Sequence, residues 1–313
     1  MATLKELAKR PEILTPGHRL CAGCGASVVI RQILSASEKP VVVACATGCL
    51  EVSTTVYPYT AWQAGFIHSA FENAAATISG VEAAYNVLKR RGKIKDELNF
   101  VAIGGDGGTY DIVFQSLSGA FERGHRMLYV CYNNEAYMNT GIQRSSATPL
   151  GAWTTTSEVG PKQAGKRERR KDLTAAMAAH GGYVAQASPS QWHDLIKKAE
   201  KAFAFNGPSF INVIAPCPRG WRFTSSDTIK QARLAVDTCI WPLYEVEDGL
   251  WRLTYKPKEK KPITEWLKLQ GRFKHLFTPQ NEAVLKEIQA QVDRDWQKLL
   301  RLCGEEETPK TKT

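Results

Sequence analysis

Two groups of residues in this sequence have types and spacings that could carry chemistry. The first is a Gly-Gly-Asp-Gly-Gly run at residues 104–108, centred on Asp106, which is followed by Asn133 and Asn134 after the next predicted strand. Glycines let the backbone approach a diphosphate, and the amide groups of a helix starting near Tyr110 would point towards it. An aspartate beside a diphosphate is expected mainly as a ligand of a divalent ion, because Mg²⁺ binds one or two protein carboxylates together with phosphate oxygens. The side-chain oxygen of Asn134 and the backbone carbonyl of Ala136 could complete the octahedron.

The spacing of this run argues against the dinucleotide-binding fingerprint. That fingerprint has the form Gly-x-Gly-x-x-Gly with an acidic residue about 20 residues later, and neither residues 105–110 nor the segment after them fits it. A glycine-rich turn alone is weak evidence, since many α/β proteins have one for structural reasons. A Gly-Asp-Gly at one strand end followed by Asn-Asn at the next is narrower, and it resembles the diphosphate–Mg²⁺ motif of thiamine diphosphate enzymes.

The second group consists of cysteines. Cys21 and Cys24 form a Cys-x-x-Cys pair, Cys49 follows a Thr-Gly dipeptide, and Cys217 lies between two prolines. In a cytosolic chain such a pair more often holds a metal or does redox chemistry than forms a structural disulfide. Zinc sites usually close with a second Cys-x-x-Cys pair, whereas single cysteines at the ends of different strands favour a [4Fe–4S] cluster held by four thiolates. Zinc and a purely structural pair remain the alternatives.

The composition is that of a soluble globular protein. The chain has 313 residues, of which 43% are hydrophobic, and Lys and Arg outnumber Asp and Glu by 41 to 31. No apolar run approaches the roughly 20 residues of a membrane span, and no signal peptide is evident, so we expect a cytoplasmic protein without membrane contact. The net charge of +10 fits an anionic cofactor or an acidic partner. The basic run 166–171 lacks interleaved aromatics, so we expect a solvated loop or an acidic-partner contact there rather than nucleic-acid binding.

These residues need a scaffold that brings distant segments together, and the hydrophobic pattern supplies one. Short apolar runs at 41–45, 99–103, 127–132, 183–187 and 209–214 predict parallel strands covered on both faces. Helices are predicted between them, at 26–35, at 68–91, from an Asp172 cap to residue 180, and from Pro189 to residue 205. This alternating order predicts a doubly wound α/β fold with a mainly parallel sheet, in which ligands lie at the carboxyl ends of the strands.

The pattern changes after residue 216. We expect residues 1–216 to form the α/β domain that carries the chemistry, and residues 217–313 to form a C-terminal arm that packs on the core or on a partner subunit. An amphipathic stripe at 280–302 predicts a long helix in this arm.

Five stretches taken together are more specific than either group of residues alone: 17–24, 57–60, 104–112, 134–141 and 215–221. They are similar to the β subunit of pyruvate:ferredoxin oxidoreductase, a member of the 2-oxoacid:ferredoxin oxidoreductases, and the resemblance extends from about residue 15 to residue 275. It implies a thiamine diphosphate-binding fold. It also implies oxidative decarboxylation of pyruvate with CoA to acetyl-CoA and CO₂, with the electrons passed to ferredoxin.

The resemblance assigns roles to residues of this sequence. The ligands of the [4Fe–4S] cluster nearest the thiamine correspond to Cys21, Cys24, Cys49 and Cys217. The Mg²⁺ site corresponds to Asp106, Asn134 and the carbonyl of Ala136. The remaining cofactor-binding positions correspond to Gly105, Gly107, Gly108 and Thr140. Asn139 matches a residue beside the thiazolium ring, where it can hydrogen-bond the substrate-derived intermediate.

The resemblance also implies that this chain holds only half of an active site. In this family the glutamate that protonates the aminopyrimidine lies on the partner α subunit, and no glutamate here matches it. The residues that bind the substrate are expected mainly on that α subunit as well. Further Fe–S clusters are expected in another subunit, with ferredoxin as the electron acceptor.

One position departs from the family pattern. Pyruvate enzymes commonly carry Gly-Leu where this chain has Val113 and Phe114. Ordinary helix repacking explains the bulkier pair, and so does a pocket trimmed for a smaller or flatter substrate such as oxalate, which would be split to CO₂ without CoA. Two other hypotheses stay open: a zinc-stabilised structural subunit that does not use thiamine, and a non-redox thiamine decarboxylase.

Overall fold

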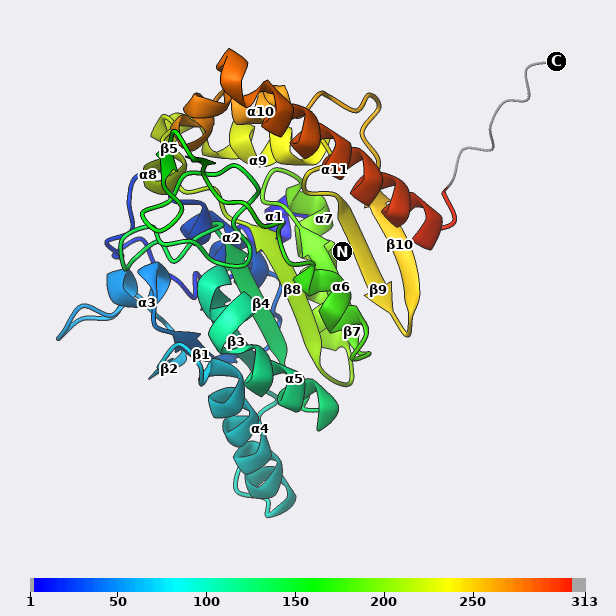
Figure 1. Ribbon diagram of the computed structural model, residues 1–313. Helices are drawn as coiled ribbons and strands as arrows, with labels where there is room; N and C mark the ends of the chain where they lie inside the picture. Colours follow the sequence, from blue (N-terminus) through cyan, green and yellow to red (C-terminus); the bar gives the residue numbers. More distant parts are fainter. Residues whose placement is uncertain (1–2, 306–313) are drawn as a thin grey trace.

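An eight-stranded sheet runs through the centre of the molecule in the computed structural model, which describes residues 3–305 (Figure 1). Its strand order is β10-β9-β7-β8-β4-β3-β1-β2. The strands are β1 (Val41–Ala46), β2 (Gly65–Ser69), β3 (Asn99–Gly105), β4 (Leu128–Asn133), β7 (Tyr183–Ala187), β8 (Ser209–Ile214), β9 (Leu243–Glu247) and β10 (Leu250–Tyr255). The first six of these pair in parallel, whereas β9 runs antiparallel to both β7 and β10. The sheet is therefore mainly parallel, as predicted.

Apolar residues alternate between the two faces of the sheet, and helices cover both faces. On β1, Ala44 and Ala46 belong to one buried cluster, whereas Val43 and Cys45 belong to another. The first cluster includes residues of α4 (Ala74–Arg90), α5 (Phe114–Glu122), α6 (Leu173–Ala178), α9 (Thr228–Asp237) and α11 (Glu282–Leu302). The second includes residues of α2 (Gly25–Ser35) and α7 (Trp192–Ala204). Burial on both sides is the reason for the nearly continuous apolar strands, and it confirms the doubly wound α/β fold.

Shorter elements connect these layers. They are α1 (Leu4–Leu7), α3 (Cys49–Thr54), the π-helical turn η1 (Gly108–Ile112), α8 (Pro218–Trp221), η2 (Ser225–Asp227), α10 (Thr264–Leu267), η3 (Gly271–Leu276), η4 (Pro279–Asn281) and the hairpin of β5 (Val159–Gly160) and β6 (Gln163–Ala164). Across residues 3–305, no helix combines the length and the apolar character needed to cross a membrane.

Several element ends differ from the predicted ones. His68, predicted at the start of a helix, lies instead in β2, which pairs with β1 at the edge of the sheet, and α4 begins only at Ala74. The helix predicted from Pro189 begins at Trp192, because the N–H of Gln191 donates to the carbonyl of Ser188 in a turn. The predicted cap is confirmed, since the Asp172 carboxylate accepts a hydrogen bond from the N–H of Ala175 at 3.1 Å, although α6 ends at Ala178.

The chain after residue 216 contributes to the same sheet. β9 and β10 form a hairpin whose two-residue turn, Asp248 and Gly249, has positive φ at both positions, the geometry that matches the twist of paired strands. This hairpin is absent from the prediction. The predicted long helix is α11, which buries Ile288, Val292 and Trp296 on one side and lies across the top of the sheet in Figure 1. The division of the chain at residue 216 stays a prediction, and residues 306–313 lie outside the described part.

Candidate functional site

Four neighbouring parallel strands end at one edge of the sheet, and each is followed by a residue from one of the two predicted groups. Cys49 follows β1, Asp106 follows β3, Asn134 follows β4 and Cys217 follows β8. The strand order β8-β4-β3-β1 places the two oxygen-bearing residues between the two cysteines. Ligands of doubly wound folds bind at this edge of the sheet, so the topology alone assembles a candidate site.

Three oxygen atoms converge beside the ends of β3 and β4. The Oδ1 of Asn134 lies 2.9 Å from the Oδ1 of Asp106 and 2.9 Å from the carbonyl oxygen of Ala136. All three are hydrogen-bond acceptors, so without a cation the Asn134 amide would turn over and donate its NH₂ group to the other two. Adjacent oxygen ligands of an octahedral Mg²⁺, bound at about 2.0–2.1 Å, lie about 2.9 Å apart. The donor set and its spacing therefore fit a Mg²⁺ ion.

The carboxyl group of Asp106 lies in an environment that favours a nearby cation. Asp106 is fully buried, and this burial raises the pKa of its carboxyl to about 7. The Ser145 hydroxyl donates to its Oδ2 at 2.6 Å and the N–H of Asn134 donates to its Oδ1 at 3.1 Å, and both contacts oppose that rise. Within residues 3–305 no lysine or arginine forms an ion pair with it. A divalent ion at the converging oxygens would supply the missing positive charge.

Glycines next to these oxygens let two tyrosine rings pack against the backbone. A Cβ atom on Gly107 would meet the Tyr137 ring at 2.4 Å, and one on Gly105 would meet the Tyr132 ring at 3.3 Å. A depression of about 20 Å³ opens here. Its lining contains all the predicted thiamine-side positions other than Asp106, namely Gly105, Gly107, Gly108, Asn134, Ala136, Asn139 and Thr140. Cys49 also lines it, so the depression borders both predicted groups.

The Cys-x-x-Cys turn packs directly against the loop that carries Cys217. The N–H of Gly25 donates to the carbonyl of Pro216 at 3.1 Å, and a Cβ atom on Gly25 would meet the Pro216 nitrogen at 2.7 Å. Gly23 has a φ of +72°, and a Cβ atom there would meet the Ser225 carbonyl oxygen at 2.2 Å. Glycine at these two positions is what lets the two loops approach so closely.

The four predicted cluster ligands are all free thiols: Cys21, Cys24, Cys49 and Cys217. Burial raises the pKa of Cys24 to about 11 and that of Cys49 to about 12, and the nearby thiols of the group contribute to both rises. The N–H of Gly220 donates to the Sγ of Cys217 at 3.3 Å, and the nearby Asn139 side chain opposes the rise in the pKa of Cys49. Four thiols gathered in this way fit a group that binds four thiolates.

These thiols do not form a site for a single ion. In the part of the chain that the structure describes, no three His, Cys, Asp or Glu side chains form a group that could hold one metal ion. A [4Fe–4S] cluster places an iron atom at each thiolate, so its ligands stand further apart than those of one ion. The proposed Mg²⁺ site is not such a group either, because it has only one carboxylate and its other two ligands are an amide oxygen and a backbone carbonyl.

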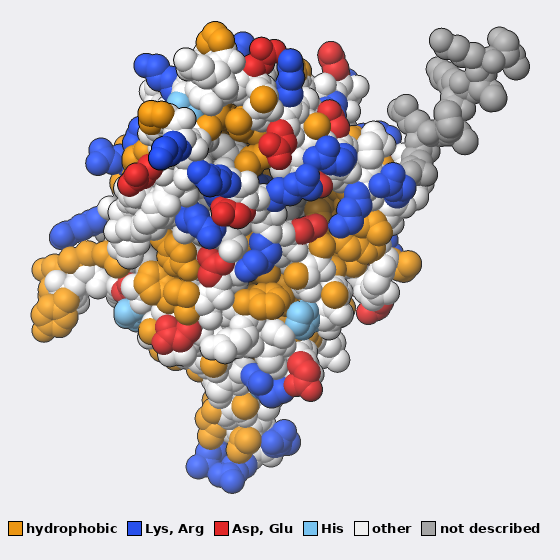
Figure 2. All heavy atoms as spheres, viewed as in Figure 1, with side chains coloured by type: hydrophobic (Ala, Val, Ile, Leu, Met, Phe, Trp, Pro, Cys, Tyr) orange, Lys and Arg blue, Asp and Glu red, His pale blue; other side chains and the backbone are white. Residues whose placement is uncertain are grey.

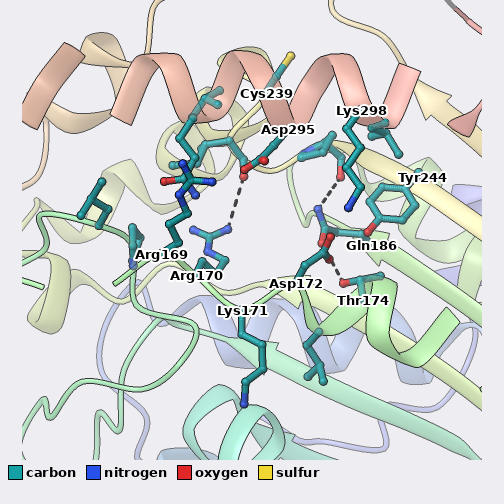
Figure 3. A pocket seen from close by; sticks show the side chains of 18 of the residues that line it. Arg169, Arg170, Lys171, Asp172, Thr174, Gln186, Cys239, Tyr244, Asp295 and Lys298 are labelled. Atoms are coloured by element: carbon teal, nitrogen blue, oxygen red, sulfur yellow. Dashed lines mark hydrogen bonds between the residues drawn. The ribbon is translucent and has the colours of Figure 1, made fainter. Parts of the chain in front are cut away.

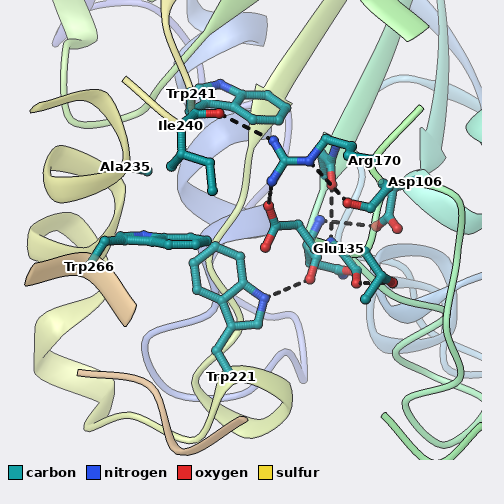
Figure 4. A network of polar contacts seen from close by, with 12 residues as sticks. Asp106, Glu135, Arg170, Trp221, Ala235, Ile240, Trp241 and Trp266 are labelled. Carbon is teal, nitrogen blue, oxygen red and sulfur yellow. Dashed lines mark hydrogen bonds and ion pairs between the residues drawn. The ribbon is translucent and has the colours of Figure 1, made fainter. Parts of the chain in front are cut away.

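The basic run at 166–171, predicted as a solvated loop or an acidic-partner contact, is solvated only in part, since Arg167, Arg169 and Lys171 are exposed but Lys166 and Arg170 are not. Lys166 is buried, and its ammonium group donates to the carbonyl of Thr148 at 2.6 Å. Arg170 forms an ion pair with Glu135 (Figure 4). Glu135 is fully buried and also pairs with Arg272. Buried acceptors therefore satisfy charges that the sequence pattern assigned to solvent. Only one feature of the sequence indicates these buried ion pairs: the acidic residue Glu135 lies between two predicted Mg²⁺ ligands.

Val113 and Phe114 belong to the packing of α5. Val113 is fully buried, and the ring of Phe114 packs edge-on against His180 with centroids 6.1 Å apart. Neither residue lines the depression. The structure therefore supports helix repacking as the reason for this pair.

A larger cavity, of about 290 Å³, lies between α11 and the segment 169–174 (Figure 3). Apolar side chains such as Val292 and Leu299 line it, and Arg169, Asp295 and Lys298 stand around it. It contains none of the predicted site residues, so the two hollows are separate features.

Comparison with known proteins identifies the class to which this fold and site belong. The family model of the thiamine pyrophosphate enzyme C-terminal TPP-binding domain matches residues 46–213, which include Asp106 and Asn134. A solved structure of 2-oxoglutarate:ferredoxin oxidoreductase from Magnetococcus marinus shares the fold, with a TM-score of 0.53 and 19% identity over 72% of this chain and 78% of that one. The fold is therefore that of a thiamine pyrophosphate enzyme.

Closer relatives narrow the class to a family. Pyruvate synthase subunit PorB of Thermotoga maritima is 51% identical over 306 residues, which cover 95% of this chain and 94% of that protein. The corresponding subunit of Methanocaldococcus jannaschii is 55% identical over 89% of this chain and 95% of its own length. The chain belongs to the family of pyruvate synthase subunit PorB, the β subunit of pyruvate:ferredoxin oxidoreductase.

Proposed function

We propose that this chain binds thiamine diphosphate, Mg²⁺ and the nearest [4Fe–4S] cluster in a complex that oxidises pyruvate with CoA to acetyl-CoA and CO₂. The observation that carries the proposal is the juxtaposition, at one edge of the sheet, of three converging oxygens and four free thiols. The names of the PorB relatives support pyruvate as the substrate. The oxalate alternative depended on Val113 and Phe114, which do not reach the depression.

The oxygen-bearing residues would hold the magnesium ion. Asp106, Asn134 and the carbonyl of Ala136 would bind Mg²⁺, and diphosphate oxygens would supply further ligands. When bound, thiamine diphosphate supplies the electron sink that decarboxylation of a 2-oxoacid requires, and the cluster accepts the two electrons one at a time. The glycines at 105, 107 and 108 line the depression, so a diphosphate bound there would lie against backbone without side chains.

The four thiols would bind the cluster as thiolates. Burial raises the pKa of Cys24 and of Cys49, so without iron both remain protonated at neutral pH, and iron binding would displace these protons. Asn139 links the two groups, since it lines the depression together with Cys49 and its side chain opposes the rise in the pKa of the Cys49 thiol. Its amide is therefore placed to interact with both the thiol and a group bound in the depression.

The depression is the open half of an active site. Its volume of about 20 Å³ is far below the roughly 300–1,000 Å³ of a complete ligand pocket, so a second subunit is needed to close it. We assign that role to the α subunit, which would supply the activating glutamate and the residues that bind substrate. Another subunit would carry further Fe–S clusters, and ferredoxin would be the electron acceptor.

An exposed aromatic loop beside the depression supports this assembly. The loop after α3 projects from the molecule, with Tyr57 94% and Tyr59 75% exposed, and hydrophobic side chains gather on the projection (Figure 2). Exposed apolar groups of this kind mark contacts between proteins. Because α3 begins at Cys49, a subunit that covered the loop would also lie next to the cluster cysteines.

The test of the substrate is anaerobic reduction of a viologen dye by the native complex. We expect reduction with pyruvate plus CoA and none with oxalate alone. Pyruvate needs CoA to carry away the two-carbon acyl product, whereas oxalate can be split fully to CO₂. Reduction by oxalate without CoA would replace the proposed substrate, and reduction only by a larger 2-oxoacid would do the same.

The test of the cluster is the metal content of the complex. We expect iron and acid-labile sulfide, with an electron paramagnetic resonance signal of a reduced [4Fe–4S] cluster that is lost when Cys217 is replaced. Zinc in place of iron would favour the zinc-stabilised structural subunit instead.

A further inference from the structure

A buried acidic residue with a strained backbone stands, in the chain, between two of the three proposed Mg²⁺ ligands (Asp106, Asn134 and Ala136, the oxygen group). Glu135 lies between Asn134 and Ala136 and is fully buried. Its φ of +65° is a left-handed conformation, which costs free energy in a residue other than glycine unless the surroundings impose it. Here they do so, because its N–H donates to the Oδ1 of Asn133 at 3.0 Å and its carbonyl accepts from the Thr148 hydroxyl at 2.7 Å.

Two arginines from distant segments hold the carboxylate of Glu135. Arg170 pairs with Oε1 and Arg272 pairs with Oε2. Figure 4 shows Arg170 reaching the carboxylate from the side of Trp241, and its guanidinium lies 5.1 Å from that ring. The side chain of Arg272 is only 2% exposed. A carboxylate held by two such arginines leaves one net positive charge inside the protein.

The same network also contacts Asn134 of the oxygen group, through Trp221 in the loop that carries Cys217. The guanidinium of Arg272 lies 4.1 Å from the centroid of a Trp221 ring, which follows Cys217 in α8. The indole N–H of Trp221 donates to the carbonyl of Asn134 at 2.8 Å (Figure 4). A closed circuit therefore runs from Glu135 through Arg272 and Trp221 back to Asn134.

Arg272 also lies close to the loop of Cys217. Its guanidinium stands 4.1 Å from the centroid of a Trp221 ring, and Cys217 is the N-cap of the four-residue helix α8 that ends at Trp221. Residues beyond the ligands themselves orient metal ligands and tune reduction potentials by their charge. Arg272 has the position for both effects, since it contacts the Trp221 ring and the carboxylate of Glu135.

We propose that Glu135, Arg272 and Trp221 form a positioning circuit that keeps the Mg²⁺ ligands and the Cys217 loop in register, and that the charge of Arg272 raises the reduction potential of the cluster. This inference rests on the proposed function, because it concerns the two groups assigned there. It makes the two sites dependent on residues whose side chains bind neither group. It also predicts that neutralising Arg272 and neutralising Glu135 shift the reduction potential of the cluster in opposite directions.

The experiment compares Arg272→Gln and Glu135→Gln in the complete complex, purified without oxygen. One readout is the midpoint potential of the cluster, followed by electron paramagnetic resonance during a redox titration. The other is the Mg²⁺ concentration that supports half-maximal thiamine diphosphate binding, measured by calorimetry. We expect Arg272→Gln to shift the potential to more negative values. Glu135→Gln should shift it to more positive values, because the charge of Arg272 then lacks its partner.

Both variants should also weaken Mg²⁺-dependent binding by about 10-fold to 100-fold, the usual loss when an outer partner of a metal site is removed. Shifts of the potential in the same direction, or Mg²⁺ binding that stays at the wild-type value, would overturn the proposal. A side chain that served only for packing would give no difference of sign between the two ends of the pair.

Three further variants guard against simple misfolding. Arg272→Lys keeps the charge but loses the planar fork, so its potential should stay near that of the wild type while Mg²⁺ binding weakens. Trp221→Phe keeps the ring but removes the donor to Asn134, and it should weaken only Mg²⁺ binding. The matched control is Arg169→Gln, because Arg169 is exposed and lies outside the circuit, and it should move neither readout.

If Glu135→Gln does not assemble, the pair Arg272→Gln and Arg272→Lys decides the question, since equal potentials in these two would overturn the charge effect. The wild-type complex separates this inference from the proposed function. A wild type without cluster signal or thiamine binding overturns both, whereas a normal wild type with unaffected variants overturns the circuit alone.

Discussion

The cavity beneath α11 has a volume of about 290 Å³, whereas the depression at the ends of β1, β3 and β4 has about 20 Å³. Apolar packing residues and exposed charges line the larger hollow. The smaller one is lined by Asn134, Ala136 and Cys49, and it lies beside Asp106, a buried carboxylate that pairs with no lysine or arginine within residues 3–305. The volume of a cavity shows how well the chain fills its own interior. Buried polar groups without a partner show instead which charges or ligands a bound group must supply. For a subunit proposed to hold half of an active site, the second is the better guide.

The largest expected difference between the two regions concerns their cysteines. Cys217→Ser removes one ligand of the proposed cluster, so iron content should fall and viologen reduction should drop to background, while thiamine diphosphate still binds. Cys303→Ser is the matched control, since Cys303 ends α11 far from the site along the chain, and it should leave both unchanged. Iron analysis and the dye assay measure this. A Cys217→Ser complex that decarboxylates and reduces the dye normally would instead favour a non-redox thiamine enzyme.

A carboxylate in each region gives the next comparison. Asp106→Asn should weaken Mg²⁺-dependent thiamine diphosphate binding by at least about 100-fold, because even outer partners of a metal cost up to that much. Without cofactor the variant should be no less stable than the wild type, because burial raises the pKa of Asp106 and the charged form is therefore disfavoured. Asp295→Asn, beside the larger cavity, should change neither quantity. Calorimetric titration and thermal unfolding test both, and normal Mg²⁺ dependence in Asp106→Asn would remove this residue from the site.

Alanine substitution at two glycines should have opposite effects, because one glycine lies where two loops touch and the other lies on an open helix surface. Gly25→Ala should reduce the iron content to less than half, because its Cβ would meet backbone atoms of the loop before Cys217 at 2.7 Å. Gly80→Ala in α4 has nothing within 4 Å of its Cβ and should stabilise the protein by about 0.5–1 kcal/mol. Iron assays and denaturant unfolding give both values. Full cluster occupancy in Gly25→Ala would show that the two loops can move apart without consequence.

The smallest effect is expected at the larger cavity. Leu299→Ala should cost about 2 kcal/mol of unfolding free energy, the lower end of the range for buried leucines, because the side chain already borders empty space. Cofactor and iron content per folded subunit should stay at the wild-type level. Urea unfolding together with metal analysis checks this, and a loss of cofactor would mean that the two regions are coupled.

The sequence predicts the buried strands well and the edge strands poorly. Each of the five predicted strands coincides with an observed one to within two residues, because a strand covered on both faces must be apolar along its length. β2 has mostly exposed or half-buried residues and β10 alternates between exposed and half-buried positions. Neither therefore shows a continuous apolar run, and the hairpin of β9 and β10 is missed for that reason.

The sequence also predicts which site residues meet, but not what holds them. The motif residues lie at the carboxyl ends of adjacent strands, so topology brings them together, while their roles as ligands stay predictions. Glu135 and Arg272 are far apart in the chain, and nothing near Arg170 distinguishes it from its exposed neighbours. Burial of a charge is decided by the whole fold, so local pattern could not reveal this network.

The order of the cysteines along the chain has a consequence for how the subunit is made. Cys21 and Cys24 precede β1, whereas Cys217 follows β8. During synthesis the first three thiols emerge long before the fourth, and the close contact between Gly25 and Pro216 forms only when the central strands are complete. A cofactor that needs all four thiols can therefore be inserted only after residue 217 of the 313 has been made. Delivery of iron and sulfide would then act as a checkpoint that a subunit terminated before Cys217 cannot pass.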